Sequence, residues 1–334
     1  MPEKVLDQSV IETEYQKNKP LYDKLGKKVK DALIKFLKDE KIDYFDVTSR
    51  TKTWKRFWEK VSSKLYKKPF QECEDICGCR IIHFYDSDTK KIEELIKKEF
   101  NAKKVEPLEG EADPERFAYR RNHYIAKIKD EWLCTPDYED FRDLKVEIQI
   151  RTMAFHAWAE IEHKLSYSSK DQIPFEIRRK FSQLCALFEI ADEKFDDVRR
   201  ERTKYSREIT KTLQKDESVE DIPVNLDSFI ALANFHFPDL PADLYDLSGL
   251  WNKIIGSTID SKEIIVCIIN LKPHLSKARA LHQRHYNRFE WDQASVICVA
   301  LDTFSDTFWD SRKNSIQSKW IEYITEMREE LRDK

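Results

Sequence analysis

The most constraining feature of the sequence is a switch from strand to helical periodicity in residues 146–167, VEIQIRTMAFHAWAEIEHKLSY. Apolar and polar residues alternate strictly through residue 151, the pattern of a strand with one buried face. The polar face of this predicted strand carries Glu147, Gln149 and Arg151, which are a carboxylate, an amide and a guanidinium in a row. We therefore expect a sheet whose polar face forms one wall of a functional site.

The helix predicted after residue 152 carries a polar stripe of its own, formed by His156, Glu160, His163 and Tyr167. A metal bound by this stripe is one interpretation. The Glu-x-x-His motif of di-iron bundles needs a second copy, however, and the sequence has neither that copy nor the HExxH motif of zinc proteases. The stripe fits better with a role in orienting or packing neighbouring groups.

The composition excludes several functional classes. The chain has 334 residues, enough for one large or two ordinary domains, and its net charge of −3 decides nothing about nucleic acid. Seven cysteines without a regular framework, and no apolar run near residue 1, predict a cytoplasmic protein. No window approaches the ~20 apolar residues of a membrane span. None of the five glycines belongs to a phosphate-binding loop motif, so cationic side chains would have to hold phosphates.

Residues 50–68, RTKTWKRFWEKVSSKLYKK, contain eight basic residues and one acidic residue. Lys52, Arg56, Lys60 and Lys64 recur at every fourth position, which predicts a helix with aromatics on one face and cations on another. A solvated basic face is an equally simple interpretation. The near absence of acids favours a polyanion such as a nucleoside triphosphate.

The segment CEDICGCRIIHFYDSD predicts a strand over residues 81–84, entered past Gly78. Asp75 and Arg80 lie near the start of this strand. A carboxylate at such a position is a natural ligand for Mg²⁺, although an Asp before a Gly is often only a turn residue. The three cysteines of the segment lack a second pair at zinc-finger spacing, so we expect buried thiols.

A second strand is predicted in FAYRRNHYIAKI, with Tyr119, two arginines and His123 near its beginning. The tyrosine could stack on a base, or it could be an ordinary edge-strand aromatic. Elsewhere, residues 9–41 predict one or two helices that start or break at Pro20, and residues 175–212 predict one long helix. The last hundred residues show helical patterns and no cluster of chemically active groups.

These motifs resemble, in order over residues 10–205, those of the RelA/SpoT-type alarmone synthetases, which are pyrophosphokinases. Five segments carry the resemblance: Arg50-x-Lys52 with Lys60; DICGCR at 75–80, similar to D-x-x-G-x-R; residues 119–123, similar to G-Y-R-S-x-H; EIQIRT at 147–152; and HAWAEIEHKLSY at 156–167. The resemblance implies an α/β (α+β) fold with a mixed sheet flanked by helices, a nucleotidyltransferase-like synthetase domain. We assign it to residues 1–212, followed by a linker at 213–223 and a mostly helical region at 224–334.

The implied activity is transfer of the β,γ-pyrophosphate of ATP to the 3′-hydroxyl of GTP or GDP with Mg²⁺, which makes the stringent-response alarmone (p)ppGpp. The resemblance assigns the metal to Asp75, with Glu147 assisting the metal or activating the acceptor hydroxyl. It assigns the following residues to the substrates: Arg50, Lys52, Lys60 and Arg80 to the ATP phosphates, Tyr119 to the acceptor base, and His123, Gln149 and Arg151 to the rest of the acceptor pocket. The sequence has no His-Asp dipeptide of the family's hydrolase domain, so synthesis without hydrolysis is expected.

Two departures affect the acceptor side, since Ala118 replaces the usual glycine and Arg121 a common serine. A toxin-type relative that pyrophosphorylates the tRNA 3′ end or an adenine nucleotide is therefore a second hypothesis. A third is a catalytically degenerate module that only binds nucleotide. For residues 224–334, autoinhibition, binding of tRNA, ribosome or another protein, and self-association all remain open.

Overall fold

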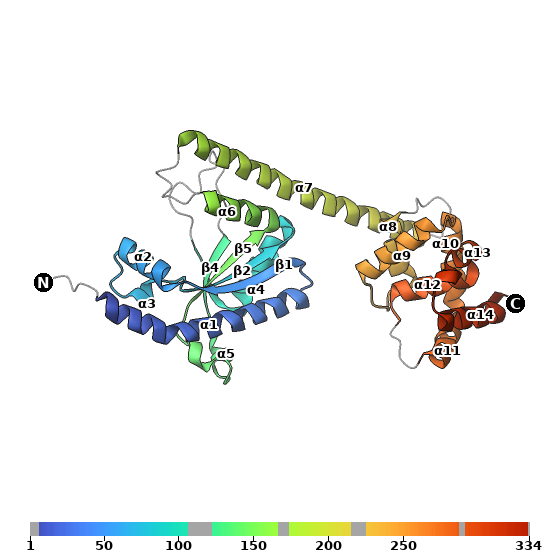
Figure 1. The fold of residues 1–334 in the computed structure, drawn as a ribbon, viewed down its shortest axis with the longest axis horizontal. Helices are drawn as coiled ribbons and strands as arrows, with labels where there is room; N and C mark the ends of the chain where they lie inside the picture. The colour runs from blue at the N-terminus through green and yellow to red at the C-terminus, as the bar shows by residue number, and fades with distance from the viewer. Residues whose placement is uncertain (1–6, 106–121, 166–173, 215–224, 287–290, 333–334) are drawn as a thin grey trace. The chain divides into compact units, whose positions relative to one another are not determined.

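The computed structural model describes residues 7–105, 122–165, 174–214, 225–286 and 291–332 (Figure 1). The chain divides into two compact units, Met1–Val198 and Arg199–Lys334. The division falls within the long helix α7 (Phe175–Gln214). Most of the linker expected at 213–223 lies outside the described residues.

The first unit is built on a five-stranded mixed sheet in the order β1-β2-β5-β4-β3. Only β2 and β5 are parallel; the other neighbouring strands are antiparallel. The strands are β1 (Tyr44–Thr51), β2 (Cys77–His83), β3 (Asn101–Lys104), β4 (Asn122–Lys127) and β5 (Val146–Thr152). The expected mixed sheet is confirmed.

Strand β5 has the alternating burial that its sequence predicts. Val146, Ile148 and Ile150 are buried, whereas Glu147 and the other polar positions are partly exposed on the opposite face. The apolar side chains join one core with residues from both helices on that face, α1 (Gln8–Asp39) and α4 (Thr89–Glu99). Burial of these apolar side chains is the main force that fixes the sheet against its helices.

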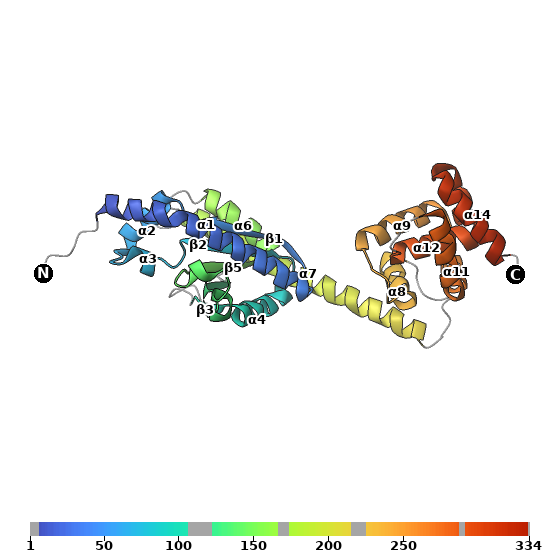
Figure 2. The same ribbon diagram turned by 90° about the horizontal axis from the view of Figure 1, so that it is seen from below.

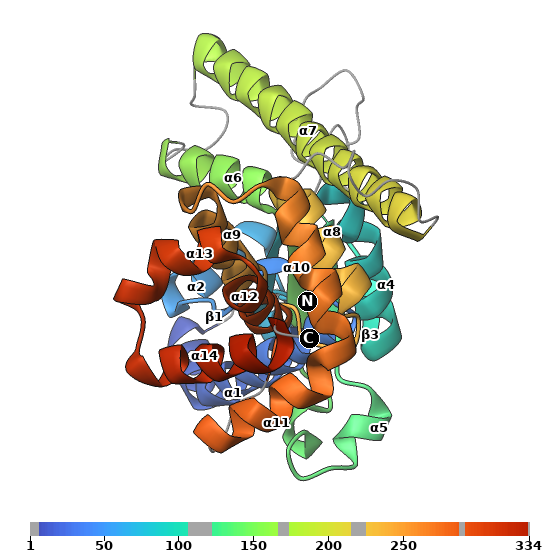
Figure 3. The same ribbon diagram turned by 90° about the vertical axis from the view of Figure 1, so that its right-hand side faces the viewer.

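Helix α6 (Met153–Leu165) covers part of the polar face, next to β2 and β5. Figures 1 and 3 show α1 and α6 on opposite sides of the sheet, and Figure 2 shows α1 running across it. Because β5 leads directly into α6, the polar row of the strand ends where the helix with its own polar stripe begins.

Helix α1 approaches the sheet closely at Gly26. A Cβ at this position would lie 3.1 Å from the sulfur of Cys77 and 3.4 Å from the Cβ of Ser49. The expected start or break at Pro20 is wrong, because α1 continues through it. Pro20 is exposed, so water can bond the carbonyl whose helical partner the proline removes.

The basic segment is divided between two elements and is not one helix from residue 50. β1 extends to Thr51, and α2 (Trp54–Lys64) begins after Thr53, whose hydroxyl accepts from the backbone N–H of Arg56. Lys52 therefore lies in the connection, outside the helical row of cations. β2 spans Cys77–His83, so it begins four residues before the expected span of 81–84 and includes Gly78.

The cysteines before and within β2 are buried free thiols, as expected. Burial raises the pKa of Cys73 and of Cys77 to about 12, so both stay protonated and unreactive at neutral pH. Short elements complete the unit: α3 (Pro69–Glu72), η1 (Asp86–Asp88), α5 (Asp130–Leu133) and η2 (Glu139–Phe141).

Two carboxylates join α7 to the end of β5 and to η1. Thr152 at the end of β5 donates to Asp192 at 2.6 Å, and the backbone and hydroxyl of Ser87 donate to Asp196 at 2.9 and 2.6 Å. Both aspartates are buried. Their spacing of four residues places them on one face of α7.

The second unit is helical, as expected for the C-terminal region. Its elements after α7 are α8 (Leu226–His236), α9 (Leu244–Gly256), α10 (Ser261–Leu271), η5 (Lys272–His274), α11 (Leu275–His285), α12 (Gln293–Phe304), α13 (Asp306–Arg312), η6 (Lys313–Ser315) and α14 (Ser318–Arg332). They enclose a separate apolar core. In the described parts of the chain, no helix is long and apolar enough to cross a membrane.

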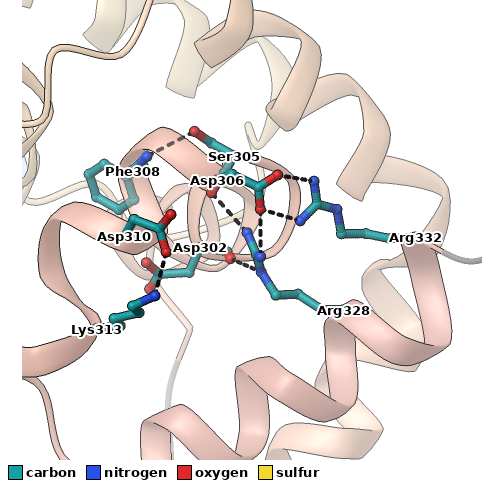
Figure 4. Close-up of polar contacts among 8 residues, drawn as sticks. All are labelled: Asp302, Ser305, Asp306, Phe308, Asp310, Lys313, Arg328 and Arg332. Atoms are coloured by element: carbon teal, nitrogen blue, oxygen red, sulfur yellow. Dashed lines mark hydrogen bonds and ion pairs between the residues drawn. The ribbon is translucent and has the colours of Figure 1, made fainter.

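An arginine of α14 fixes the corner between α12 and α13 (Figure 4). Arg328 donates to the carbonyl oxygens of Asp302 and Ser305, each at 2.9 Å, and to the carboxylate of Asp306 at 2.8 Å. Arg332 also binds Asp306 through two nitrogens. The bond to Asp302 satisfies a carbonyl in the last turn of α12. The carbonyl of Ser305 also accepts from the backbone N–H of Trp309 at 3.2 Å.

Candidate active site

A cavity of about 620 Å³ lies on the polar face of the sheet. Among the described residues, five of its lining side chains are cationic and two are carboxylates, a balance that favours a polyanionic ligand. The cations are Arg50, Lys52, Arg56, Lys60 and Arg80, and the carboxylates are Asp75 and Glu147.

Strand pairing explains why residues distant in sequence meet here. Arg50 of β1 is opposite Gly78 of β2, which is opposite Glu147 of β5. The next row on the same face contains Arg80, Gln149 and His123. Since Gly78 has no side chain, it leaves open space between Arg50 and Glu147.

Asp75 lies just before β2 and is held by two lysines. Its Oδ2 is 2.8 Å from Nζ of Lys60 and 3.3 Å from Nζ of Lys52, and the thiol of Cys73 donates to Oδ1 at 3.2 Å. Burial pushes the pKa of Asp75 upward, but the hydrogen bond from Lys60 and the charges of both lysines outweigh burial. The pKa therefore lies below its ordinary value, and Asp75 is ionised at neutral pH.

Glu147 is the second carboxylate of the cavity. Nδ1 of His123 lies 3.1 Å from one carboxylate oxygen, and the amide of Gln149 donates to the other at 2.7 Å. Burial pushes the pKa of Glu147 upward, but the contacts with His123 and Gln149 outweigh burial and the repulsion from Asp75, so the pKa is lowered. Glu147 is also ionised at neutral pH and can accept a proton or bind a cation.

The side-chain amide of Gln149 connects the carboxylate of Glu147 with a cation on β2. Its nitrogen donates to Glu147, and its oxygen accepts from Nε of Arg80 at 3.2 Å. Arg80 also donates from Nη1 to Glu160 of α6 at 2.7 Å. A continuous line of hydrogen bonds thus runs from β5 through β2 to α6.

Of the ten residues predicted to form the site, the structure brings eight to the cavity. Arg151 does not line it, because it lies one row further along the same face, level with Ile82 of β2. Tyr119 lies outside the described residues. The eight that meet are Arg50, Lys52, Lys60, Asp75, Arg80, His123, Glu147 and Gln149.

The structure adds two charged or titratable residues that the sequence reasoning did not assign to the site. Arg56 precedes Lys60 by one helical turn on α2, and this spacing was the signal that could have selected it. His163 belongs to the polar stripe of α6 and lines the cavity, whereas His156 of the same stripe does not. Glu160 contributes through its contact with Arg80.

The cavity fits a divalent cation that shares its ligands with a phosphorylated substrate. Within the described residues, no cluster of three or more His, Cys, Asp or Glu side chains could hold a metal alone. Asp75 and Glu147 offer two ionised carboxylates in one cavity. Mg²⁺ commonly binds through one or two carboxylates together with phosphates and water, so this donor set is sufficient.

Comparison with known proteins identifies the same segment. The family model described as the region found in RelA/SpoT proteins matches residues 49–172. GTP pyrophosphokinase YjbM of Bacillus subtilis (strain 168) is 30% identical over 160 residues, which are 46% of this chain and 72% of YjbM. GTP pyrophosphokinase YwaC of the same organism is 26% identical over 159 residues, which are 45% of this chain and 73% of YwaC.

Two solved structures are similar to part of this chain. The small alarmone synthetase 1 of Bacillus subtilis bound to its product pppGpp has a TM-score of 0.46 and 24% identity, covering 56% of this chain and 98% of that chain. A GTP pyrophosphokinase family protein of Streptococcus pneumoniae has a TM-score of 0.47 and 22% identity, covering 56% and 94%. The family match over the segment that builds the cavity, together with the identity to most of YjbM, shows that this chain belongs to the RelA/SpoT family.

Proposed function

We propose that this chain is a pyrophosphokinase that transfers the β,γ-pyrophosphate of ATP to the 3′-hydroxyl of GTP or GDP. The observation that carries the proposal is the single cavity in which two ionised carboxylates lie among five cations, in a member of this family. Phosphate-transfer sites need cations to spread the phosphate charge and a group near the attacking hydroxyl. The relatives YjbM and YwaC are named as GTP pyrophosphokinases, which supports the same acceptor here.

In this reaction the 3′-oxygen of the acceptor forms a bond to the β-phosphorus of ATP. The bond between that phosphorus and the oxygen bridging to the α-phosphate breaks, so AMP leaves and the acceptor gains a pyrophosphate. Glu147 is the candidate to take the proton of the attacking hydroxyl, because it is ionised and fixed from two sides by His123 and Gln149. The lysines and arginines of the cavity would bind the ATP phosphates.

Asp75 and Glu147 would hold Mg²⁺ in the loaded enzyme. The ion would neutralise part of the phosphate charge when it is bound. Lys52 and Lys60 form ion pairs with Asp75 in the structure. In the loaded enzyme they would instead bind phosphate oxygens of ATP.

The test is an assay of the purified full chain with Mg²⁺, ATP labelled in its γ-phosphate, and GDP or GTP. We expect AMP and a labelled 3′-pyrophosphorylated guanine nucleotide. Glu147→Gln should lower the rate at least about 100-fold, because the proton acceptor is removed. Glu131→Gln, at an exposed position outside the cavity, is the matched control. Wild-type activity in Glu147→Gln, or no transfer in the wild type, would reject the proposal.

The same assay decides between acceptors. Deacylated tRNA and adenine nucleotides are added in parallel, because residues 118–121 of the acceptor segment lie outside the described residues. Label in RNA or in an adenine nucleotide, with none in GDP or GTP, would establish the toxin-type activity instead. Nucleotide binding without transfer to any acceptor would indicate a module that only binds.

We also propose residues 1–212 as the synthetase and residues 224–334 as a regulatory or interaction region. Each compact unit has its own apolar core, which supports separate roles. Comparing the activity and growth toxicity of residues 1–212 with those of the full chain tests this division. A higher activity or toxicity of the shorter chain would show that the C-terminal region restrains the synthetase, and equal values would exclude restraint.

A further inference from the structure

The guanidinium of Arg80 is held from two sides by groups that belong to different elements. Gln149 of β5 accepts from Nε, and Glu160 of α6 accepts from Nη1. The Arg80 side chain is only 17% exposed, whereas that of Glu160 is 54% exposed. Arginine has five N–H donors. Among the described residues these bonds use two of them, which leaves three for an anionic ligand in the cavity that Arg80 lines.

The position of Glu160 is unusual, because a carboxylate beside a polyanion site repels the ligand. Burial pushes the pKa of Glu160 upward, but the hydrogen bond and charge of Arg80, with His156 and Arg151 nearby, lower it overall. Glu160 is therefore ionised at neutral pH. If it acted only through its charge, it would weaken the binding of ATP.

We propose that Glu160 is the positioning residue for Arg80 in the donor-phosphate site. Arginine is a long side chain with many rotamers, and a bond fixed at one end of its planar group limits where the other N–H groups point. With Gln149 at Nε and Glu160 at Nη1, the plane of the guanidinium is defined before ATP arrives. This inference rests on the proposed function and names a residue of α6 that sets the affinity for the nucleotide donor.

The effect extends to the acceptor side through Gln149. Its oxygen accepts from Arg80, so its nitrogen is directed toward Glu147. Loss of the Arg80 position would let the amide turn and present its oxygen to Glu147, which is repulsive. Glu160 thus supports the orientation of Arg80 and, through Gln149, that of Glu147, although it does not contact Glu147.

The direction in which a Glu160 substitution changes nucleotide affinity distinguishes a positioning role from simple charge repulsion. We expect Glu160→Ala to raise the KM for ATP and the dissociation constant of the ATP analogue AMPCPP about tenfold, because the preorganised contact is lost. Glu160→Gln keeps an acceptor and should give a smaller increase. A tighter AMPCPP complex or a lower KM in either variant would show that Glu160 acts by charge alone and would overturn the proposal.

A double-mutant cycle shows whether Glu160 acts through Arg80. In the Arg80→Ala background, Glu160→Ala should change AMPCPP binding by less than about twofold. The matched control is Glu162→Gln on the same helix, a residue that does not line the cavity, and it should bind AMPCPP like the wild type. A tenfold effect of Glu160→Ala that persists without Arg80 would reject the positioning role.

Binding and turnover together distinguish this inference from the proposed function. If the wild type binds AMPCPP but transfers no pyrophosphate, the proposed activity fails while the binding measurements still decide the role of Glu160. If the wild type does not bind AMPCPP, both fail. Unchanged melting temperatures of the Glu160 variants are expected, because the residue is half exposed and belongs to no apolar core.

Discussion

Nζ of Lys60 lies 2.8 Å from Oδ2 of Asp75, so the carboxylate best placed for a metal is already paired with a lysine. Lys52 is 3.3 Å from the same oxygen. A cation can therefore bind Asp75 with high affinity only when another anion draws the lysines away. Under the proposed function the phosphates of ATP are such an anion, so we expect metal and nucleotide to bind together.

Magnesium binding should depend on nucleotide. We expect calorimetric titration to show little binding of Mg²⁺ to the protein alone and clear binding in the presence of AMPCPP. Lys60→Met removes one competing charge, so it should strengthen metal binding without nucleotide and weaken AMPCPP binding about tenfold. Equal Mg²⁺ affinity with and without AMPCPP in the wild type would contradict this coupling.

Gly78 should tolerate a small side chain but not a large one. A Cβ at this position meets only the carbonyl oxygen of Glu147, at 3.7 Å, which is an ordinary contact. Gly78→Ala should therefore fold normally, and Gly78→Leu should fill the space between Arg50 and Glu147 and abolish AMPCPP binding. Melting temperature and AMPCPP titration measured on the same samples separate occlusion from unfolding; a Leu variant that binds like the wild type would exclude occlusion.

Asp192 should make the stability of the first unit depend on pH. Burial, with Asp86 and Asp196 nearby, raises the pKa of Asp192 to about 6 despite its hydrogen bond from Thr152. The folded chain then holds this proton more tightly than the unfolded chain, whose pKa is near 3.8. The group's contribution to stability is therefore greatest below about pH 4 and is lost as the pH rises to about 6.

We expect Asp192→Asn to be more stable than the wild type by about 2 kcal/mol at pH 7.5, and by much less at pH 4.5. Asparagine keeps an oxygen that can accept from Thr152 and removes the buried charge. Chemical denaturation at both pH values measures the difference. Asp130→Asn, where the carboxylate is almost fully exposed, should show no such pH dependence; a constant difference for Asp192→Asn would refute the prediction.

Arg328 should be a strong point of stability in the helical unit. Its side chain is 18% exposed and bonds two carbonyls and one carboxylate. Arg328→Ala removes all three bonds, including the one to the carbonyl of Asp302 in the last turn of α12, and should destabilise this unit by about 2 kcal/mol. Arg284→Ala removes a side chain that is 68% exposed and has one long contact with Glu326, and should cost less than about 0.5 kcal/mol. Similar thermal shifts for the two variants would contradict this ranking.

The local spacing of polar and apolar residues was sufficient to predict several strands and helices. The strand β5 and the long helix α7 follow from the spacing of apolar residues, and α6 follows from the spacing of its polar stripe, because side-chain direction is fixed by backbone geometry. The same reasoning failed at Pro20 and at Lys52. At Pro20, the packing of buried residues on both sides of the proline keeps α1 continuous. At Lys52, the pairing of β1 up to Thr51 places the lysine in a connection and not in α2.

The sequence by itself determined which chemical groups are present: two carboxylates, a row of cations without balancing acids, and a polar strand face. Only the tertiary structure decided which of them meet. The parallel pairing of β2 with β5 places Arg80 opposite Gln149, and the approach of α2 and α6 brings Lys60 to Asp75 and Glu160 to Arg80. Strand order and register arise from contacts between distant segments, and no local period encodes them.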